Sequence, residues 1–192
     1  MTFDPQKHHR RSIRLQGYDY SQPGAYFITL VTREREVLFG EIAGGELRLS
    51  EIGRIAEQHW RAIPEHFPQV ELGAYVIMPN HIHGIIIIRP DSVGVGASQW
   101  DAPTSDVDDP TNDAPADKKL GPQRGSIGAI TGAYKMSVSR RFKRELNVIP
   151  LWQRNYYEHI IRGEEEYRRI DAYITANIDN WMHDSENPGR LK

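Results

Sequence analysis

The amino-acid sequence predicts an α+β domain of two layers, in which helices pack on an antiparallel sheet. Residues 26–32, YFITLVT, combine β-branched and aromatic side chains as strands do. The segments 70–78 and 81–89 are equally strand-like, and the short Pro-Asn connection between them is typical of a hairpin. Helices are indicated at 51–66 and 127–146, where apolar residues recur at intervals of three and four.

The limits of several elements can also be predicted. Ser50 and Ser126 stand where they can cap the two helices. A Gly-Gly turn separates a short strand pair, 39–42 and 46–49. A last helix is expected from about residue 164 to residue 183.

Length and composition restrict the class of protein. The chain has 192 residues, 39% of them hydrophobic, which suits one globular domain with a core of ordinary size. The absence of cysteine excludes disulfides, thiolate metal sites and cysteine nucleophiles. We expect a cytoplasmic protein, because no apolar run could cross a membrane and none follows the basic N-terminus as in a secretory signal.

Charge divides the chain into regions. We expect a flexible basic arm at 1–16, a single domain at 17–183 and a C-terminal tail at 184–192. An acidic insertion, expected to be disordered, interrupts the domain at 91–121. Residues 91–117 hold seven of the 26 acidic residues and no lysine or arginine, so the remainder has 24 basic and 19 acidic residues. A moderately basic domain permits contact with phosphate groups.

His81 and His83 flank Ile82 directly after the Pro-Asn turn. Alternate side chains of a strand share a face, so both imidazoles would project to one side of the sheet and Ile82 to the other. Two such histidines can ligate one divalent metal ion. They could also be two ordinary polar residues on a solvated face, although the apolar strand that follows argues for a dedicated role.

Tyr173 and Asn177 lie four residues apart on the last predicted helix and therefore share a face. An asparagine oxygen can ligate a metal ion, and a tyrosine can act as a nucleophile. A tyrosine on an apolar helix face is often a core residue, so the spacing leaves both interpretations open.

The segment 151–162, LWQRNYYEHIIR, interleaves aromatic rings with cationic groups, a composition suited to unpaired nucleic acid. The basic side of the helix at 127–146 could extend this surface. An aromatic corner of the core and a solvated helix face would explain the same residues. The candidate DNA-binding residues are Trp152, Arg154, Tyr157, His159 and Arg162, together with Lys135, Arg140, Arg141, Lys143 and Arg144.

Taken together, these segments resemble the single-tyrosine HUH transposases, and among them the REP-associated tyrosine transposases. The resemblance extends from about residue 17 to residue 181. It rests on YFITLVT, VIMPNHIHGIIII, GAITGAYKMSVSRRF, LWQRNYYEHIIR and YITAN, which follow one another in the expected order.

The resemblance implies a ferredoxin-like α+β fold, with the histidine pair on a central strand of an antiparallel sheet and the helices on one face. It implies an enzyme that cleaves and rejoins single-stranded, hairpin-bearing DNA, such as REP-like palindromes, with Mg²⁺ or Mn²⁺. His81, His83 and Asn177 correspond to the metal ligands, and Tyr173 to the nucleophile that forms a 5′-phosphotyrosine. The wider group includes homodimers, so a dimer is a further expectation.

Some features depart from the family pattern. Many relatives have proline where this chain has Ile178. Tyr156 and Tyr157 are rival nucleophiles, since they too lie near basic residues. Two other functions remain open: a domesticated protein that binds DNA or RNA hairpins without cutting them, and a hydrolase that uses metal-activated water.

Overall fold

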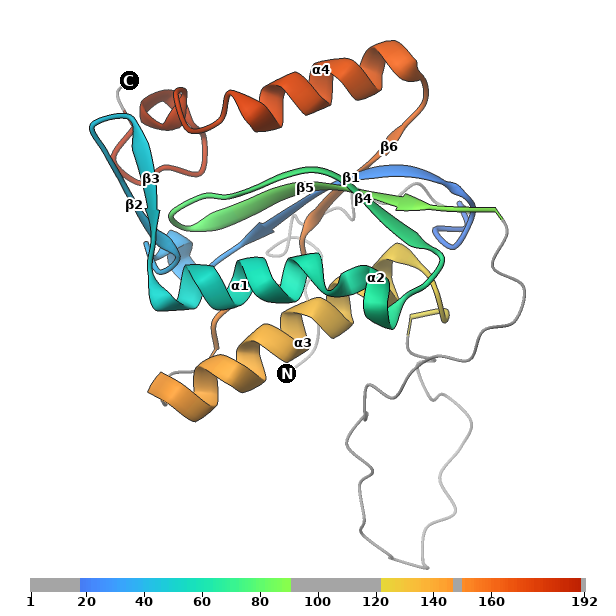
Figure 1. Cartoon of the computed structure of the whole chain (residues 1–192), viewed down its shortest axis with the longest axis horizontal. Coiled ribbons are helices and arrows are strands. Elements are labelled where there is room, and N and C mark those ends of the chain that lie inside the picture. The colour runs from blue at the N-terminus through green and yellow to red at the C-terminus, as the bar shows by residue number, and fades with distance from the viewer. Residues whose placement is uncertain (1–17, 91–121, 147–149, 191–192) are drawn as a thin grey trace, which may run out of the picture.

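The computed structural model describes residues 18–90, 122–146 and 150–190 (Figure 1). The basic arm expected at 1–16 and the acidic insertion expected at 91–121 lie outside the described residues. Within the described ranges, no helix is both long and apolar enough to span a bilayer.

Four strands form the main sheet in the order β4-β5-β1-β6, and every neighbouring pair is antiparallel. Two more strands, β2 and β3, form a separate hairpin. The strands are β1 Gly24–Val31, β2 Gly40–Ala43, β3 Glu46–Leu49, β4 Val70–Ile77, β5 His81–Ile88 and β6 Tyr157–Ile161. The helices are α1 Glu51–Arg61, α2 Ile63–His66, α3 Ile127–Leu146 and α4 Glu164–Thr175, with 3-10 turns η1 Arg33–Arg35 and η2 Trp181–His183.

The chain order β1-α1-β4-β5-α3-β6, combined with this strand order, is the split β-α-β pattern of a ferredoxin-like fold. The predicted α+β class is therefore confirmed. The histidine pair begins β5, one of the two central strands, as expected.

The expectation that the helices lie on one face of the sheet is wrong for α4. Figure 1 shows α1, α2 and α3 below the sheet and α4 above it. The reason is that both faces of the sheet are apolar. Ile82 and Ile86 of β5 join the core between the sheet and helices α1 and α3, whereas Ile85 joins a second core cluster that includes Ile174 of α4.

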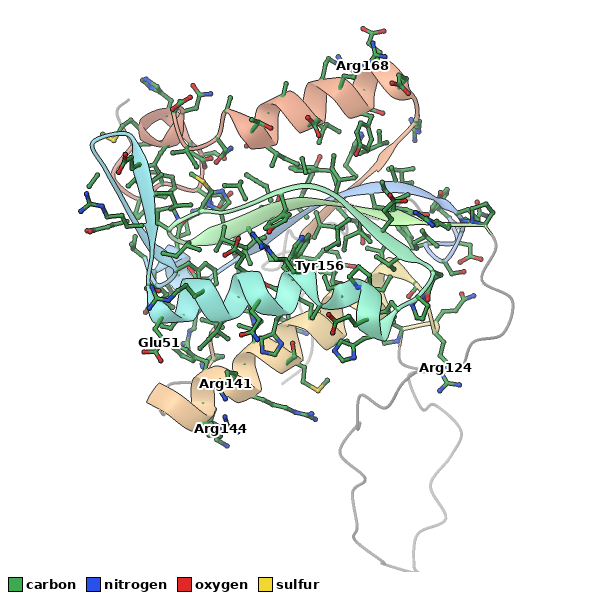
Figure 2. All side chains as sticks on the ribbon, in the orientation of Figure 1. Glu51, Arg124, Arg141, Arg144, Tyr156 and Arg168 are labelled. Atoms are coloured by element: carbon green, nitrogen blue, oxygen red, sulfur yellow. The ribbon has the colours of Figure 1, made fainter. Side chains whose placement is uncertain are left out.

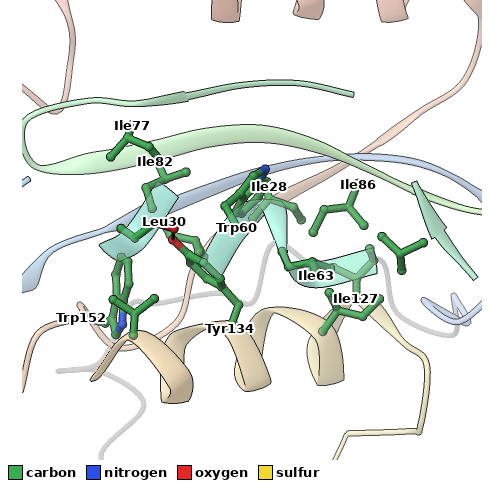
Figure 3. Close-up of a cluster of buried hydrophobic side chains, with 14 of the residues drawn as sticks. Ile28, Leu30, Trp60, Ile63, Ile77, Ile82, Ile86, Ile127, Tyr134 and Trp152 are labelled. Carbon is green, nitrogen blue, oxygen red and sulfur yellow. Dashed lines mark hydrogen bonds between the residues drawn. The ribbon is translucent and has the colours of Figure 1, made fainter. Parts of the chain in front are cut away.

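The lower layer is a closed apolar core, in which Trp60 of α1 and Tyr134 of α3 meet edge to face at 5.2 Å (Figure 3). Both side chains are almost fully buried. Gly84 allows Trp60 to lie against β5, because a side chain at that position would collide with the indole ring. The lower layer therefore holds β5, and with it the histidines, in a fixed position.

Several helix and strand boundaries differ between the prediction and the structure. Ser50 caps α1 as expected, accepting a hydrogen bond from the Gly53 N–H at 3.1 Å. The single helix expected at 51–66 is two helices, α1 and α2, with Pro64 in the first turn of α2. The aromatic and basic segment after residue 150 contains the edge strand β6, which pairs with β1. The last helix ends at Thr175 and not near residue 183.

Candidate metal and nucleophile site

The two imidazoles lie side by side beneath α4. His81 is fully buried and His83 is 4% exposed, and their ring centroids are 4.4 Å apart. Both are on the face of β5 opposite Ile82, because side chains alternate along the strand. The predicted shared face of the histidine pair is therefore present.

Each imidazole is held through its Nδ1 atom. His81 Nδ1 lies 2.9 Å from Asn80 Oδ1, and His83 Nδ1 lies 2.9 Å from the Thr29 hydroxyl. The Nε2 atoms are left to face the space under α4. Burial lowers the pKa of His81 to about 3, and burial followed by the neighbouring His81 lowers the pKa of His83 to about 3. Both rings are therefore neutral near pH 7, the form in which histidine binds metal ions.

Tyr173 of α4 reaches this pair from above. Its hydroxyl oxygen is 3.2 Å from His83 Nε2 of the same chain, and its ring meets Phe27 edge-on at 6.1 Å. The side chain is 46% exposed. Partial burial and the charge of Asp184 raise the pKa of Tyr173, while a hydrogen bond with Asn177 lowers it.

Asn177 lies just beyond the end of α4 and is 1% exposed. Within the described residues its Oδ1 atom has no hydrogen-bond partner, and the same is true of His81 Nε2. A buried polar atom without a hydrogen-bond partner costs about 1–3 kcal/mol. Two such atoms in one small region indicate a site built to receive a donor or a cation.

Asp184 is a site residue that the sequence did not reveal. It follows η2 and is 8% exposed, and its Oδ2 atom lies 3.8 Å from His81 Nε2. Ligand atoms of His81, His83 and Asp184 lie within 4.8 Å of one another. No sequence motif links Asp184 with the two histidines, and the sequence predicts a C-terminal tail from residue 184. In the structure this stretch is part of the fold up to residue 190, with Asp184 and Asn187 buried.

The donor set fits a divalent cation. Two neutral imidazole nitrogens and one carboxylate oxygen lie together. Asn177, whose side chain hydrogen-bonds Tyr173, adds an unpartnered oxygen. Imidazole and oxygen ligands together suit borderline and hard divalent ions. A cation among these ligand atoms would offset the charge of Asp184.

A cleft of about 930 Å³ opens beside Tyr173 and His83. Its walls include Phe27 of β1, Tyr157 of β6 and the loop 153–156. Tyr157 is 45% exposed and meets Phe27 edge-on at 6.1 Å. The cleft thus joins the predicted nucleophile to two of the predicted DNA-binding residues, Arg154 and Tyr157.

Trp152 and Lys135 lie beneath this cleft. Trp152 is 8% exposed, packs against Phe39 and Tyr134, and donates its indole N–H to Lys135 O at 3.0 Å. Lys135 is half-buried, and its ammonium group donates to Gln153 O at 2.9 Å and to Asn155 O at 3.1 Å. In this structure both side chains support the wall of the cleft.

The other candidate DNA-binding residues are spread over two regions. His159 contacts Glu166 at 2.8 Å, and the Arg162 N–H donates to the same carboxylate at 2.7 Å, at the corner where β6 leads to α4. Arg140, Arg141, Lys143 and Arg144 are exposed on α3. Figure 2 shows Arg141 and Arg144 on the lower layer, across the sheet from α4. The structure therefore does not bring the basic side of α3 to the nucleophile.

We compared this chain with known proteins, first by sequence and then by structure. No family model matches the chain. A Haemophilus influenzae protein named only as an uncharacterized protein is 38% identical over 180 residues, which are 92% of this chain and 92% of that protein. This chain therefore belongs to the same family as the Haemophilus protein.

Among solved structures, a REP-associated tyrosine transposase bound to a REP hairpin is similar, with a TM-score of 0.54 and 16% identity. The alignment covers 89% of this chain and 74% of the transposase chain. The chain thus has the fold of a REP-associated tyrosine transposase, which confirms the predicted resemblance at the level of the fold.

Proposed function

We propose that this protein is a metal-dependent enzyme that cleaves and rejoins single-stranded DNA through a 5′-phosphotyrosine at Tyr173. The observation that carries the proposal is the position of the Tyr173 hydroxyl, 3.2 Å from His83 Nε2 beside the unpartnered acceptor of His81. A nucleophile next to a set of metal ligands, open to a cleft, is the arrangement that phosphoryl transfer requires.

His81, His83 and Asp184 would hold Mg²⁺ or Mn²⁺, with Asn177 as a further oxygen ligand. When bound, the ion supplies positive charge that polarises the scissile phosphate. Positive charge among these ligands would also offset Asp184, whose charge raises the pKa of Tyr173. Tyr173 would then lose its proton more readily than in the metal-free protein.

In the cleavage step a lone pair of the Tyr173 hydroxyl oxygen forms the new bond to phosphorus. The phosphorus–O3′ bond breaks, and its electron pair goes to the 3′-oxygen, which takes a proton from solvent to become a 3′-OH. The tyrosine proton passes to solvent in the cleft that Tyr173 lines. Because the tyrosyl ester retains the energy of the original bond, attack by another 3′-OH can reverse the step and join strands.

The substrate we propose is single-stranded DNA that carries a hairpin. The similar transposase was solved with a REP hairpin. In this chain Arg154 and Tyr157 line the cleft beside the nucleophile, where a cation can meet a phosphate and an exposed ring can meet an unpaired base. Lys135, Trp152, His159 and Arg162 would shape or border this surface. The basic side of α3, with Arg140, Arg141, Lys143 and Arg144, would contact the backbone of the same DNA beyond the cleft.

The test is trapping of a covalent adduct. Wild-type protein, Mn²⁺ and a labelled hairpin with single-stranded flanks should give a denaturant-resistant protein–DNA band. Tyr173→Phe should abolish that band. Tyr157→Phe is the matched control, because Tyr157 is similarly exposed in the same cleft, and it should still form the adduct.

The same experiment separates the alternatives. An adduct that persists in Tyr173→Phe and disappears in Tyr157→Phe would transfer the role to Tyr157. Cleavage without an adduct that survives Tyr173→Phe would indicate a hydrolase using activated water. Hairpin binding without cleavage in either metal ion would indicate a binding protein. Because Tyr173 meets His83 within one chain, cleavage should not require a dimer.

A further inference from the structure

Asn80, the residue before the first histidine, is fully buried and contacts three separate parts of the chain. Its Nδ2 atom donates to Arg35 O at 3.1 Å and to Glu186 O at 2.7 Å. Its Oδ1 atom lies 2.9 Å from His81 Nδ1. The Asn80 amide therefore joins the turn before β5, the η1 turn and the segment that follows η2.

These partners determine which way the amide faces. The oxygens of Arg35 and Glu186 are backbone carbonyls, which can only accept hydrogen bonds. The NH₂ group of Asn80 must therefore face them, and Oδ1 must face the imidazole. An amide oxygen is also only an acceptor, so the proton in the contact belongs to His81 Nδ1. The other neutral tautomer would place two acceptors 2.9 Å apart.

We infer that Asn80 is a positioning residue that fixes His81 in the Nδ1–H tautomer and thereby turns a lone pair at Nε2 toward Asp184. The inference rests on the proposed function, since it assigns to that lone pair the binding of a divalent cation. His81 Nε2 is buried, and within the described residues it lacks a hydrogen-bond partner. It is thus a free ligand atom, kept so by the bond on the opposite side of the ring.

His83 differs in this respect. Its Nδ1 partner is the Thr29 hydroxyl, at 2.9 Å. A hydroxyl can either donate or accept, so Thr29 permits both tautomers of His83. The Asn80 amide permits one tautomer of His81.

Asn80 also connects His81 with the chain that carries Asp184. The Glu186 carbonyl accepts from Asn80, and the Glu186 N–H donates to Asp184 Oδ1 at 2.6 Å. Asp184 Oδ2 is left to face His81. The Arg35 carbonyl that accepts from Asn80 belongs to a residue with φ of 59°, a left-handed conformation that an arginine rarely adopts. The Asn80 amide therefore fixes the positions of His81 and Asp184 relative to each other and stabilises the strained turn at Arg35.

The first test uses the wild-type, full-length chain without metal. Long-range ¹H–¹⁵N correlation spectra of the imidazoles near neutral pH should show His81 protonated at Nδ1 and unprotonated at Nε2. The His81 signals are assigned by their loss in His81→Gln. A His81 that carries its proton on Nε2 would overturn the inference, whatever any Asn80 variant does.

The second test compares two buried asparagines. Asn80→Ala should populate both His81 tautomers and weaken Mn²⁺ binding, measured by calorimetry, roughly 10- to 100-fold. Asn187→Ala is the matched control, because Asn187 is 8% exposed and bonds the backbone of Trp181 and Gly189. It should leave the tautomer unchanged and Mn²⁺ affinity within about twofold of wild type. Unchanged affinity in a folded Asn80→Ala would contradict the inference.

Asn80→Asp provides a second test in case Asn80→Ala does not fold. The aspartate keeps an acceptor beside His81 and loses both N–H donors, so the Nδ1 proton should remain while amide exchange at residues 184–187 rises roughly tenfold. Loss of the Nδ1 proton in this variant would contradict the inference. If wild-type protein binds no Mn²⁺, the proposed function fails, and the metal-free spectra still decide the tautomer.

Discussion

The two faces of β5 are built from neighbouring residues and have opposite characters. Toward α1 and α3, Ile82 and Ile86 join a cluster of buried hydrophobic side chains. Toward α4, His81 and His83 are equally buried, but their ligand atoms lie close to a carboxylate, that of Asp184. One strand thus supplies stability on one side and reactive groups on the other.

The difference between the two faces shows how a small domain can remain folded although it buries polar groups. Unpartnered acceptors destabilise a fold, and burial of titratable rings adds to that cost. The closed lower layer, with Trp60 and Tyr134 against the sheet, offsets it (Figure 3). We therefore expect changes on the upper face to alter chemistry and changes on the lower face to alter stability.

The largest effect is expected from removing divalent cations. Chelation should reduce DNA cleavage roughly 10³-fold, because metal-ion charge contributes several kcal/mol to stabilising the transition state. Added Mn²⁺ should restore cleavage, which a gel assay measures. Hairpin affinity serves as the control and should change little, since Arg154 and Tyr157 lie in the cleft outside the ligand set. Full cleavage in chelator would refute a metal-dependent reaction.

Ile86→Ala should lower the free energy of unfolding by about 2–5 kcal/mol, measured by urea titration. Ile86 is fully buried on the lower face, and its truncation leaves a cavity. The protein that remains folded should bind Mn²⁺ as wild type does. A loss of Mn²⁺ affinity without a loss of stability would show that the two faces are not separate in function.

Acidification should destabilise the protein through the upper face. The pKa of both histidines is lowered from 6.5 to about 3 in the folded state. Between those values the unfolded chain binds more protons, so this stability is complete above about pH 6.5 and is lost as the pH falls toward 3. The contribution is at most about 1.4 kcal/mol per pH unit for each histidine.

Urea titrations of metal-free protein at about pH 7, 6 and 5 measure this effect. A His81→Gln/His83→Gln double variant should lose less stability over that range than wild type. Equal slopes for the two proteins would mean that the rings do not remain neutral when buried.

The smallest effect is expected at Lys135, which joins the lower layer to the wall of the cleft. Lys135→Met removes the bonds to Gln153 O and Asn155 O, and should weaken single-stranded DNA binding roughly fivefold without changing Mn²⁺ affinity. Fluorescence anisotropy measures the former. Arg168→Met, on the exposed part of α4 and outside the proposed DNA-binding surface, is the matched charge control. An equal loss in both variants would indicate that the cation acts by charge and not by supporting the loop.

Local patterns in the sequence anticipated many of the elements. The strands predicted from the composition of β1 and β5, the helical spacing in α1 and α3, and the Ser50 cap all appear in the structure. The edge strand β6 was harder to foresee, because its aromatic and basic residues resemble a surface segment and its pairing with β1 joins distant parts of the chain. The position of α4 on the upper face had no local signal either, since an amphipathic helix can cover either face of an apolar sheet.

The sequence by itself determined that His81 and His83 project from one face of their strand and that Tyr173 and Asn177 lie four residues apart on one side of a helical turn. Both follow from strand and helix periodicities, which are properties of local backbone geometry. Only the tertiary structure decided that α4 covers the histidine face, that Tyr173 meets His83, and that Asp184 lies 3.8 Å from His81. These contacts join residues about 90 to 100 positions apart, and no local periodicity extends over that distance. They follow from the packing of α4 and the segment after η2 against the sheet.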